Sequence, residues 1–128
     1  MNLYTVMLVD DEEEVRQAII RKLEWNDIGF QVTGYAENGE EALEKAEILR
    51  PDVVMTDIKM PFMDGLTLCR RIREKLLHTK LIIFSGFDEF EYAKEAIKLE
   101  VEEYVLKPID ASELKNVFQR IKVQLDKE

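Results

Sequence analysis

The sequence predicts an α/β fold in which helices cover both faces of a parallel β-sheet. Short apolar runs alternate along the chain with longer segments of helical periodicity, which is typical of this class. Several of the runs are continuously apolar, as strands that are buried on both faces require. The chain has 128 residues, 46% of them hydrophobic, which is enough for one hydrophobic core. We therefore expect residues 1–128 to form a single domain.

The first part of the chain predicts two strand–helix pairs. Tyr4–Val9 is a short β-branched and apolar run, and Phe30–Ala36 alternates apolar with polar residues like a half-exposed strand. Asn38 is suited to cap the helix that follows the second strand. The apolar residues at helical spacing are Val15, Ala18, Ile19 and Leu23 in the first helix and Ala42, Leu43, Ala46 and Leu49 in the second.

The rest of the chain predicts three further pairs. Val53–Thr56, Leu81–Phe84 and Tyr104–Leu106 are apolar runs that stop at polar residues, as expected of buried strands. Asp110 and Glu113 have the spacing of a capping box at the start of the last helix. The helices are marked by apolar residues at Leu66, Cys69 and Ile72, at Phe90, Ala93 and Ile97, and at Leu114, Val117, Phe118, Ile121 and Leu125.

Five strands that alternate with five helices predict a doubly wound (βα)5 sandwich. The second strand is more polar than the others and therefore belongs at an edge, which fits the flavodoxin-like strand order 2-1-3-4-5. In sheets of this order, ligands bind beyond the carboxyl ends of the strands, at the crevice between the first and third strands. A functional site is expected at that crevice.

Charged and hydroxyl side chains are expected to converge on this crevice. They are Asp10 and Asp11 after the first strand, Asp57 after the third, Ser85 after the fourth and Lys107 after the fifth. Three ionised carboxylates repel one another by roughly a few kcal/mol per pair at this range, so the cluster requires a cation. Oxygen ligands with room for water favour Mg²⁺.

Each of these residues also has an ordinary interpretation when it is taken alone. Asp10 and Asp11 could cap the first helix, and Asp57 could cap a turn. Ser85-Gly86 is typical of a turn, and a lysine such as Lys107 is usually a solvated charge. Capping does not require all of them to meet, so their joint placement at strand ends favours a functional site.

The composition excludes several classes of function. The chain has 18 basic and 27 acidic residues, and its net charge of −9 has the wrong sign for binding nucleic acid. No apolar run approaches the ~20 residues of a membrane helix, and the N-terminus lacks a signal-peptide pattern, so a cytoplasmic protein is expected. The single cysteine, Cys69, excludes an internal disulfide and makes a thiolate metal site a poor interpretation.

The residues at the crevice, with their neighbours, resemble the receiver domain of bacterial two-component response regulators over essentially the whole chain. The motifs that carry the resemblance are Asp10-Asp11, Asp57 followed by Met60-Pro61 and Asp64-Gly65, Ser85-Gly86, and Lys107-Pro108. The resemblance implies that Asp57 accepts a phosphoryl group from a phosphohistidine of a sensor histidine kinase or from a small acyl phosphate. It further implies that Mg²⁺ is held by Asp10, Asp11, Asp57 and the backbone carbonyl of Lys59.

The resemblance also implies roles for residues after phosphorylation. Lys107, beside a cis peptide bond to Pro108, would pair with the phosphoryl oxygens, and the Ser85 hydroxyl would hydrogen-bond the attached group. Tyr104 would then rotate inward and alter the surface made by the fourth helix, the fifth strand and the fifth helix. The ordinary interpretation of Tyr104 is a half-buried tyrosine that packs against a helix.

Residues 85–93 are similar to receivers that are fused to AraC-type helix-turn-helix DNA-binding domains. The expected function is a phosphorylation-activated switch that acts on an output domain, absent from this chain, and thereby regulates transcription. The alternative is a stand-alone phosphoryl shuttle in a phosphorelay. Phosphorylation-dependent homodimerisation would favour the switch, and rapid back-transfer to histidine would favour the shuttle.

A metabolic enzyme is not expected. Phosphatases of the haloacid dehalogenase type also use a strand-end aspartate as phosphoryl acceptor, but they need a second aspartate at the position of Lys59. A nucleotide-binding protein is not expected either, because neither glycine-rich phosphate-binding motif occurs in the chain.

Overall fold

The computed structural model describes residues 2–86, 94, 96, 98 and 100–128. Five parallel strands form one sheet in the order β2-β1-β3-β4-β5, as predicted. The strands are β1 (Tyr4–Val9), β2 (Phe30–Ala36), β3 (Val53–Asp57), β4 (Lys80–Ser85) and β5 (Glu103–Leu106). The helices that lie wholly within the described residues are α1 (Glu13–Lys22), α2 (Gly39–Leu49), α3 (Gly65–Lys75), α5 (Ala111–Asp126) and the 3-10 helix η1 (Trp25–Ile28).

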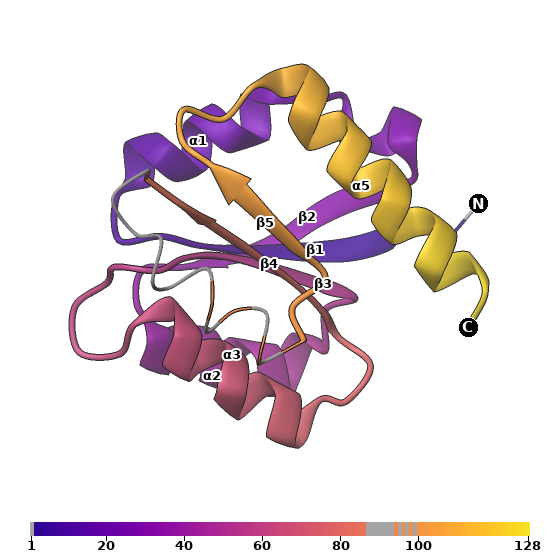
Figure 1. Ribbon diagram of the computed structural model, residues 1–128. Coiled ribbons are helices and arrows are strands. Elements are labelled where there is room, and N and C mark those ends of the chain that lie inside the picture. The colour runs from indigo at the N-terminus through magenta and orange to yellow at the C-terminus, as the bar shows by residue number, and fades with distance from the viewer. Residues whose placement is uncertain (1, 87–93, 95, 97, 99) are drawn as a thin grey trace.

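The helices form two layers around the sheet. Helices α1 and α5 cover one face, and α2 and α3 cover the other (Figure 1). The core beneath α1 and α5 includes Trp25 and Phe30, whose rings meet that of Phe118 edge to face at centroid distances of 4.9 and 5.0 Å. The second core, beneath α2 and α3, is aliphatic and includes Met7 and Val54. Burial on both faces explains why the central strands are unbroken apolar runs.

Side-chain caps define where three of the helices begin. Asn38 Oδ1 accepts a hydrogen bond from the backbone N–H of Glu41 at 2.9 Å, which confirms Asn38 as the cap of α2. Asp110 Oδ2 accepts one from the N–H of Glu113 at 3.0 Å at the start of α5, as the capping-box spacing predicted. Asp64 caps α3 in the same way, through the N–H of Thr67 at 2.8 Å.

The observed elements differ from the predicted ones at some boundaries and in one added turn. Strands β3 and β4 are longer than predicted and include Asp57 and Ser85, because Asp57 still pairs with Phe84 and Ser85 with Leu106. The 3-10 helix η1 was not predicted, since a single tight turn has no apolar period of its own. The helix expected around Phe90, Ala93 and Ile97 lies outside the described residues. No helix within the described part of the chain has the length and apolarity needed to span a bilayer.

Gly65 allows α3 to begin directly against the end of β3. Its backbone N–H donates to the carbonyl of Ile58 at 2.7 Å. A Cβ at this position would collide with the carbonyl oxygen of Asp57 and lie 3.0 Å from the Cα of Ile58. The absence of a side chain at Gly65 therefore permits this close approach to the backbone of Asp57.

We predict that Gly65→Ala lowers the free energy of unfolding by about 2 kcal/mol, measured by urea denaturation. The new methyl group meets backbone, so the overpacking cost of about 1–3 kcal/mol outweighs the gain of up to about 1 kcal/mol in helix propensity. Gly34→Ala is the control, because its Cβ would meet side-chain atoms and no backbone: the end of Leu49 at 2.8 Å and Cγ of Met7 at 3.9 Å. A loss at Gly65 no greater than that at Gly34 would contradict the close-approach argument.

Candidate functional site

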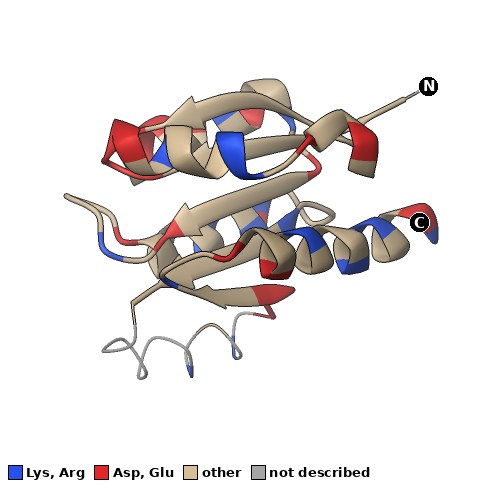
Figure 2. Ribbon diagram, turned by 90° about the horizontal axis from the view of Figure 1, so that it is seen from above, with Lys and Arg blue, Asp and Glu red and all other residues tan. Residues whose placement is uncertain are grey.

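The strand register brings the predicted site residues to one edge of the sheet. Val9 pairs with Thr56, so the next residues, Asp10 and Asp57, follow side by side from β1 and β3. Ser85 pairs with Leu106, which places Lys107 at the same edge. Figure 2 shows a group of Asp and Glu residues at the end of the molecule to which the strand arrows point. The predicted convergence at the carboxyl ends of the strands is confirmed.

Asp57 is a buried carboxylate that faces a lysine. The residue is 6% exposed, and its Oδ1 accepts a hydrogen bond from the N–H of Ile58 at 2.8 Å. Its Oδ2 lies 3.5 Å from Nζ of Lys107. The Lys107 backbone N–H donates to the carbonyl of Ser85 at 2.7 Å, and its ammonium lies 5.3 Å from the centroid of the Phe84 ring. Residues at the ends of β4 and β5 thus hold the ammonium group of Lys107 beside Asp57.

Asp10 is more deeply buried, and one of its oxygens is not satisfied. The residue is 1% exposed, and Oδ1 accepts a hydrogen bond from the N–H of Glu12 at 2.8 Å. Oδ2 is buried without a hydrogen-bond partner among the described residues. Burial, with a smaller contribution from the neighbouring Asp57 carboxylate, raises the pKa of Asp10 from 3.8 to about 6, although the hydrogen bond from Glu12 lowers it. A bound cation would satisfy this oxygen and offset the cost of its burial.

The acidic group around Asp10 is compatible with Mg²⁺. Within the described ranges, the carboxylates of Asp10, Asp11 and Glu12 each place an oxygen within 4.8 Å of the other two. Asp11 and Glu12 are exposed, which leaves room for the water that Mg²⁺ retains. This tight group does not include Asp57, whose Oδ2 lies beside Lys107. The ligand set of Asp10, Asp11, Asp57 and the Lys59 carbonyl therefore stays a prediction, with Lys59 in the exposed loop after β3.

Glu12 is a site residue that the sequence analysis missed. The sequence analysis assigns it no role, whereas in the structure its carboxylate lies close to those of Asp10 and Asp11. Its position directly after the Asp10-Asp11 pair was the available signal. Glu12 also precedes the first residue of α1, so its backbone N–H is free of the helix and can donate to Asp10.

Ser85 and Tyr104 are joined at the same edge. Ser85 is fully buried, and its hydroxyl is hydrogen-bonded to the hydroxyl of Tyr104. Tyr104 is half-buried and packs against the core beneath α2 and α3. The neighbouring Val105 belongs to the opposite core, in keeping with the alternation of a strand. The peptide bond between Lys107 and Pro108 is cis, as the family resemblance implied.

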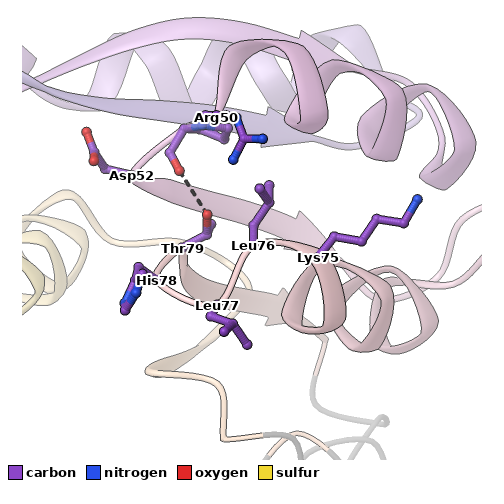
Figure 3. Close-up of a pocket in the computed structure, with 8 residues that line it drawn as sticks. Arg50, Asp52, Lys75, Leu76, Leu77, His78 and Thr79 are labelled. Carbon is purple, nitrogen blue, oxygen red and sulfur yellow. Dashed lines mark hydrogen bonds between the residues drawn. The ribbon is translucent and has the colours of Figure 1, made fainter.

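A separate cavity of about 350 Å³ lies at the amino ends of the strands, just before β3 and β4. Figure 3 shows the residues that line it, among them Arg50, Lys75 and His78. Thr79 Oγ1 donates to the carbonyl of Pro51 at 3.0 Å across its floor. Because parallel strands all run the same way, this cavity lies at the far end of the strands from Asp10 and Asp57, and it takes no part in the acidic site.

The fold and the site together define a flavodoxin-like domain that carries a buried aspartate, a facing lysine and a cation-compatible acidic group at its switch point. The sequence matches the response regulator receiver domain over residues 6–119. The chain therefore belongs to the receiver domain family of response regulators.

Individual relatives agree with this assignment. The chain is similar to the REC domain of AraT, a response regulator from Geobacillus stearothermophilus, with 44% identity, a TM-score of 0.93 and coverage of 98% of this chain and 97% of that one. It is also similar to a two-component transcriptional regulator, AraC, from Clostridium phytofermentans, with 33% identity, a TM-score of 0.87 and coverage of 94% and 93%.

Longer relatives contain the same domain as one part. The transcriptional regulatory protein YesN of Bacillus subtilis is 38% identical over 98% of this chain, which covers 34% of YesN. The transcriptional regulatory protein HptR of Staphylococcus aureus is 35% identical over 93% of this chain, which covers 46% of HptR. The chain thus spans between a third and a half of the length of these relatives.

We predict that Asp10→Asn stabilises the metal-free protein at neutral pH. The folded-state pKa of Asp10, about 6, lies above its unfolded value of 3.8, so stability is lost as the pH rises through this window. At about pH 7, in EDTA, the variant should gain up to about 3 kcal/mol in the free energy of unfolding. The gain should shrink toward about pH 4.5, as followed by urea denaturation.

Asp11→Asn is the matched control, because Asp11 is exposed and its substitution relieves no burial. An advantage of Asp10→Asn that does not change with pH would contradict the assigned pKa.

Proposed function

We propose that this receiver domain is a phosphorylation-activated switch in which Asp57 accepts the phosphoryl group. The observation that carries the proposal is the buried Asp57 carboxylate with Lys107 Nζ 3.5 Å from its Oδ2, beside the acidic group of Asp10. Phosphoryl transfer depends mainly on positioning and on charge neutralisation, and these residues offer both.

The chemical step assigns one role to each residue. A carboxylate oxygen of Asp57 attacks the phosphorus, the bond from phosphorus to the donor breaks, and its electron pair leaves with the donor. Lys107 pairs with the phosphoryl oxygens, whose charge would otherwise face the buried Asp10. The backbone N–H of Ile58 holds Asp57 Oδ1, which keeps the carboxylate oriented toward the open edge.

The predicted ligands of Mg²⁺ are Asp10, Asp11, Asp57 and the carbonyl of Lys59, and Glu12 lies close enough to contribute through water. When bound, Mg²⁺ neutralises charge on the transferring phosphoryl oxygens. The unsatisfied Asp10 Oδ2 supports this assignment, because oxygen is the ligand atom that Mg²⁺ prefers.

The Ser85–Tyr104 hydrogen bond is the proposed route by which the signal leaves the site. A phosphoryl group on Asp57 competes with Tyr104 for the Ser85 hydroxyl. If Ser85 turns to the phosphoryl group, Tyr104 loses its partner and repacks at β5. Because Tyr104 already contacts Ser85 in this structure, the proposed change is a release of the tyrosine and not the inward rotation that the family resemblance implied. The two hydrogen-bonding arrangements of Ser85 supply the two-state element that a switch requires.

The proposed phosphodonor is a sensor histidine kinase, and the proposed output is transcription. An apolar cleft of about 270 Å³ beside Lys107, between α1 and the Pro108-Ile109 segment, supports docking of a protein donor. YesN and HptR are transcriptional regulators of which this domain matches only a part, which supports a DNA-binding output domain elsewhere in the full regulator. We further propose that the protein acts in the cytoplasm. We also propose that phosphorylation favours a homodimer.

Incubation with acetyl phosphate tests the acceptor. We predict that the intact mass rises by one phosphoryl group only when Mg²⁺ is present, and that Asp57→Asn gains none. Lys107→Ala should slow the gain by about 100-fold, because one charged contact to the phosphoryl oxygens is lost.

Lys115→Ala is the matched control, since Lys115 is an exposed lysine on α5 that takes no part in the site. Phosphorylation of Asp57→Asn at the native rate, or no gain by the native protein with Mg²⁺, would refute the proposal.

A further inference from the structure

Arg16, on α1, is a charged side chain that is almost wholly buried beside the acidic residues. It is 3% exposed, and its guanidinium donates to the backbone carbonyl of Asp10 at 2.6 Å. Burial of a cation costs several kcal/mol unless partners offset it. Nothing in the chemical step assigned to Asp57 and Lys107 uses this guanidinium, so its burial needs a separate explanation.

The partners of Arg16 come from β1 and from the end of β2. Its second terminal nitrogen lies 3.9 Å from Glu37 Oε1, and its guanidinium carbon lies 4.8 Å from the centroid of the Tyr35 ring. These two contacts place the guanidinium against the end of β2, while its other terminal nitrogen donates to Asp10. Arginine is suited to such a place, because it stacks on a ring while its fork of donors meets oxygen atoms.

The Asp10 backbone is thereby held from both sides. Its N–H donates to the carbonyl of Ala36 at 3.1 Å, and its carbonyl accepts from Arg16. Its side-chain Oδ1 is held by the N–H of Glu12, which leaves Oδ2 as the oxygen available to a ligand. With these three contacts in place, little freedom remains to turn the Asp10-Asp11 pair away from the edge.

We propose that Arg16 is a positioning residue for the cation site, which it serves by fixing the Asp10 carbonyl and with it the orientation of the Asp10 and Asp11 carboxylates. This inference rests on the proposed function, because it assumes that these carboxylates bind Mg²⁺. Residues that orient metal ligands typically contribute 10–100-fold to metal affinity.

The direction of the effect distinguishes positioning from simple electrostatics. A guanidinium near a cation site repels the cation, so charge alone predicts that its removal tightens Mg²⁺ binding. Positioning predicts the opposite, because the acidic pair loses its orientation. The direction in which the Mg²⁺ dissociation constant changes in an Arg16 variant therefore decides between the two explanations.

The test is isothermal titration calorimetry of the whole chain with MgCl₂ alone. Arg16→Met should raise the dissociation constant by about 10-fold. Arg16→Lys keeps the charge and one donor but not the planar fork, and should recover part of the affinity. If Arg16→Met does not fold, Tyr35→Ala replaces it: Tyr35 is 48% exposed, and loss of its ring contact should raise the constant by about threefold.

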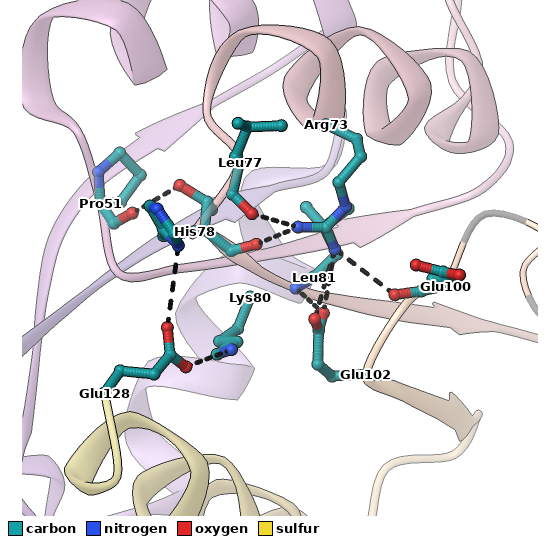
Figure 4. A network of polar contacts seen from close by, with 10 residues as sticks. Pro51, Arg73, Leu77, His78, Lys80, Leu81, Glu100, Glu102 and Glu128 are labelled. Atoms are coloured by element: carbon teal, nitrogen blue, oxygen red, sulfur yellow. Dashed lines mark hydrogen bonds and ion pairs between the residues drawn. The ribbon is translucent and has the colours of Figure 1, made fainter.

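Arg73→Met is the matched control, because Arg73 also donates to backbone carbonyls but lies at the far end of the strands from Asp10. Its guanidinium donates to the carbonyls of Leu77 and Thr79 at 3.1 and 2.9 Å and to the carboxylate of Glu102 at 3.3 Å. Figure 4 shows Arg73 beside Leu77 and Glu102. This variant should lose stability without losing Mg²⁺ affinity.

Three results would overturn the positioning role. They are an unchanged or tighter dissociation constant in folded Arg16→Met, an unchanged constant in Tyr35→Ala where that variant is used, and an equal loss of affinity in Arg73→Met. Failure of the proposed function would give a different result, because the native protein would then show no Mg²⁺-dependent phosphorylation by acetyl phosphate.

Discussion

Two aspartates buried side by side at the ends of adjacent strands are the constraint on which this structure depends. Asp10 and Asp57 are 1% and 6% exposed, and burial of ionised carboxylates is costly unless each oxygen finds a partner. Backbone N–H groups of Glu12 and Ile58 hold one oxygen of each, and Lys107 faces the second oxygen of Asp57. The remaining Asp10 oxygen is the unsatisfied one, so the edge of the sheet favours a cation.

Backbone contacts from the surrounding elements help to keep this edge in place. Gly65 lets α3 begin against the carbonyl of Asp57, and Lys107 is tied by its N–H to the carbonyl of Ser85. On the other side, the carbonyl of Asp10 accepts from Arg16. Each contact joins a strand end to another element, so the acidic site is tied to α1, α3 and β5. Ser85 and Tyr104 lie on the β5 side of this arrangement.

Much of this architecture could be predicted from the sequence because it follows from burial. The polar alternation of β2 predicted its edge position, and the continuous apolar runs predicted parallel strands covered on both faces. Once the strand order was known, Asp10, Asp57, Ser85 and Lys107 had to meet, since they follow or end parallel strands.

The parts that could not be predicted depend on single contacts in three dimensions. A charged residue on a helix is usually solvated, so Arg16 gave no sign that it is buried under Asp10. Glu12 appeared to be one acidic residue among several at a helix start, and only the turn into α1 brings it to Asp10 and Asp11. Which oxygens hold Mg²⁺ depends on carboxylate orientation, on which the sequence pattern carries no information.

The most direct test of this account is the free energy of unfolding of the native protein and of Asp10→Asn as MgCl₂ is added, at neutral pH. If the buried carboxylates form the cation site, Mg²⁺ at 100 times its dissociation constant stabilises the native protein by about 2.7 kcal/mol. Asp10→Asn, which lacks one charge of the site, should gain far less over the same range of concentration. Equal stabilisation of the two proteins, or none of the native protein, would contradict the account.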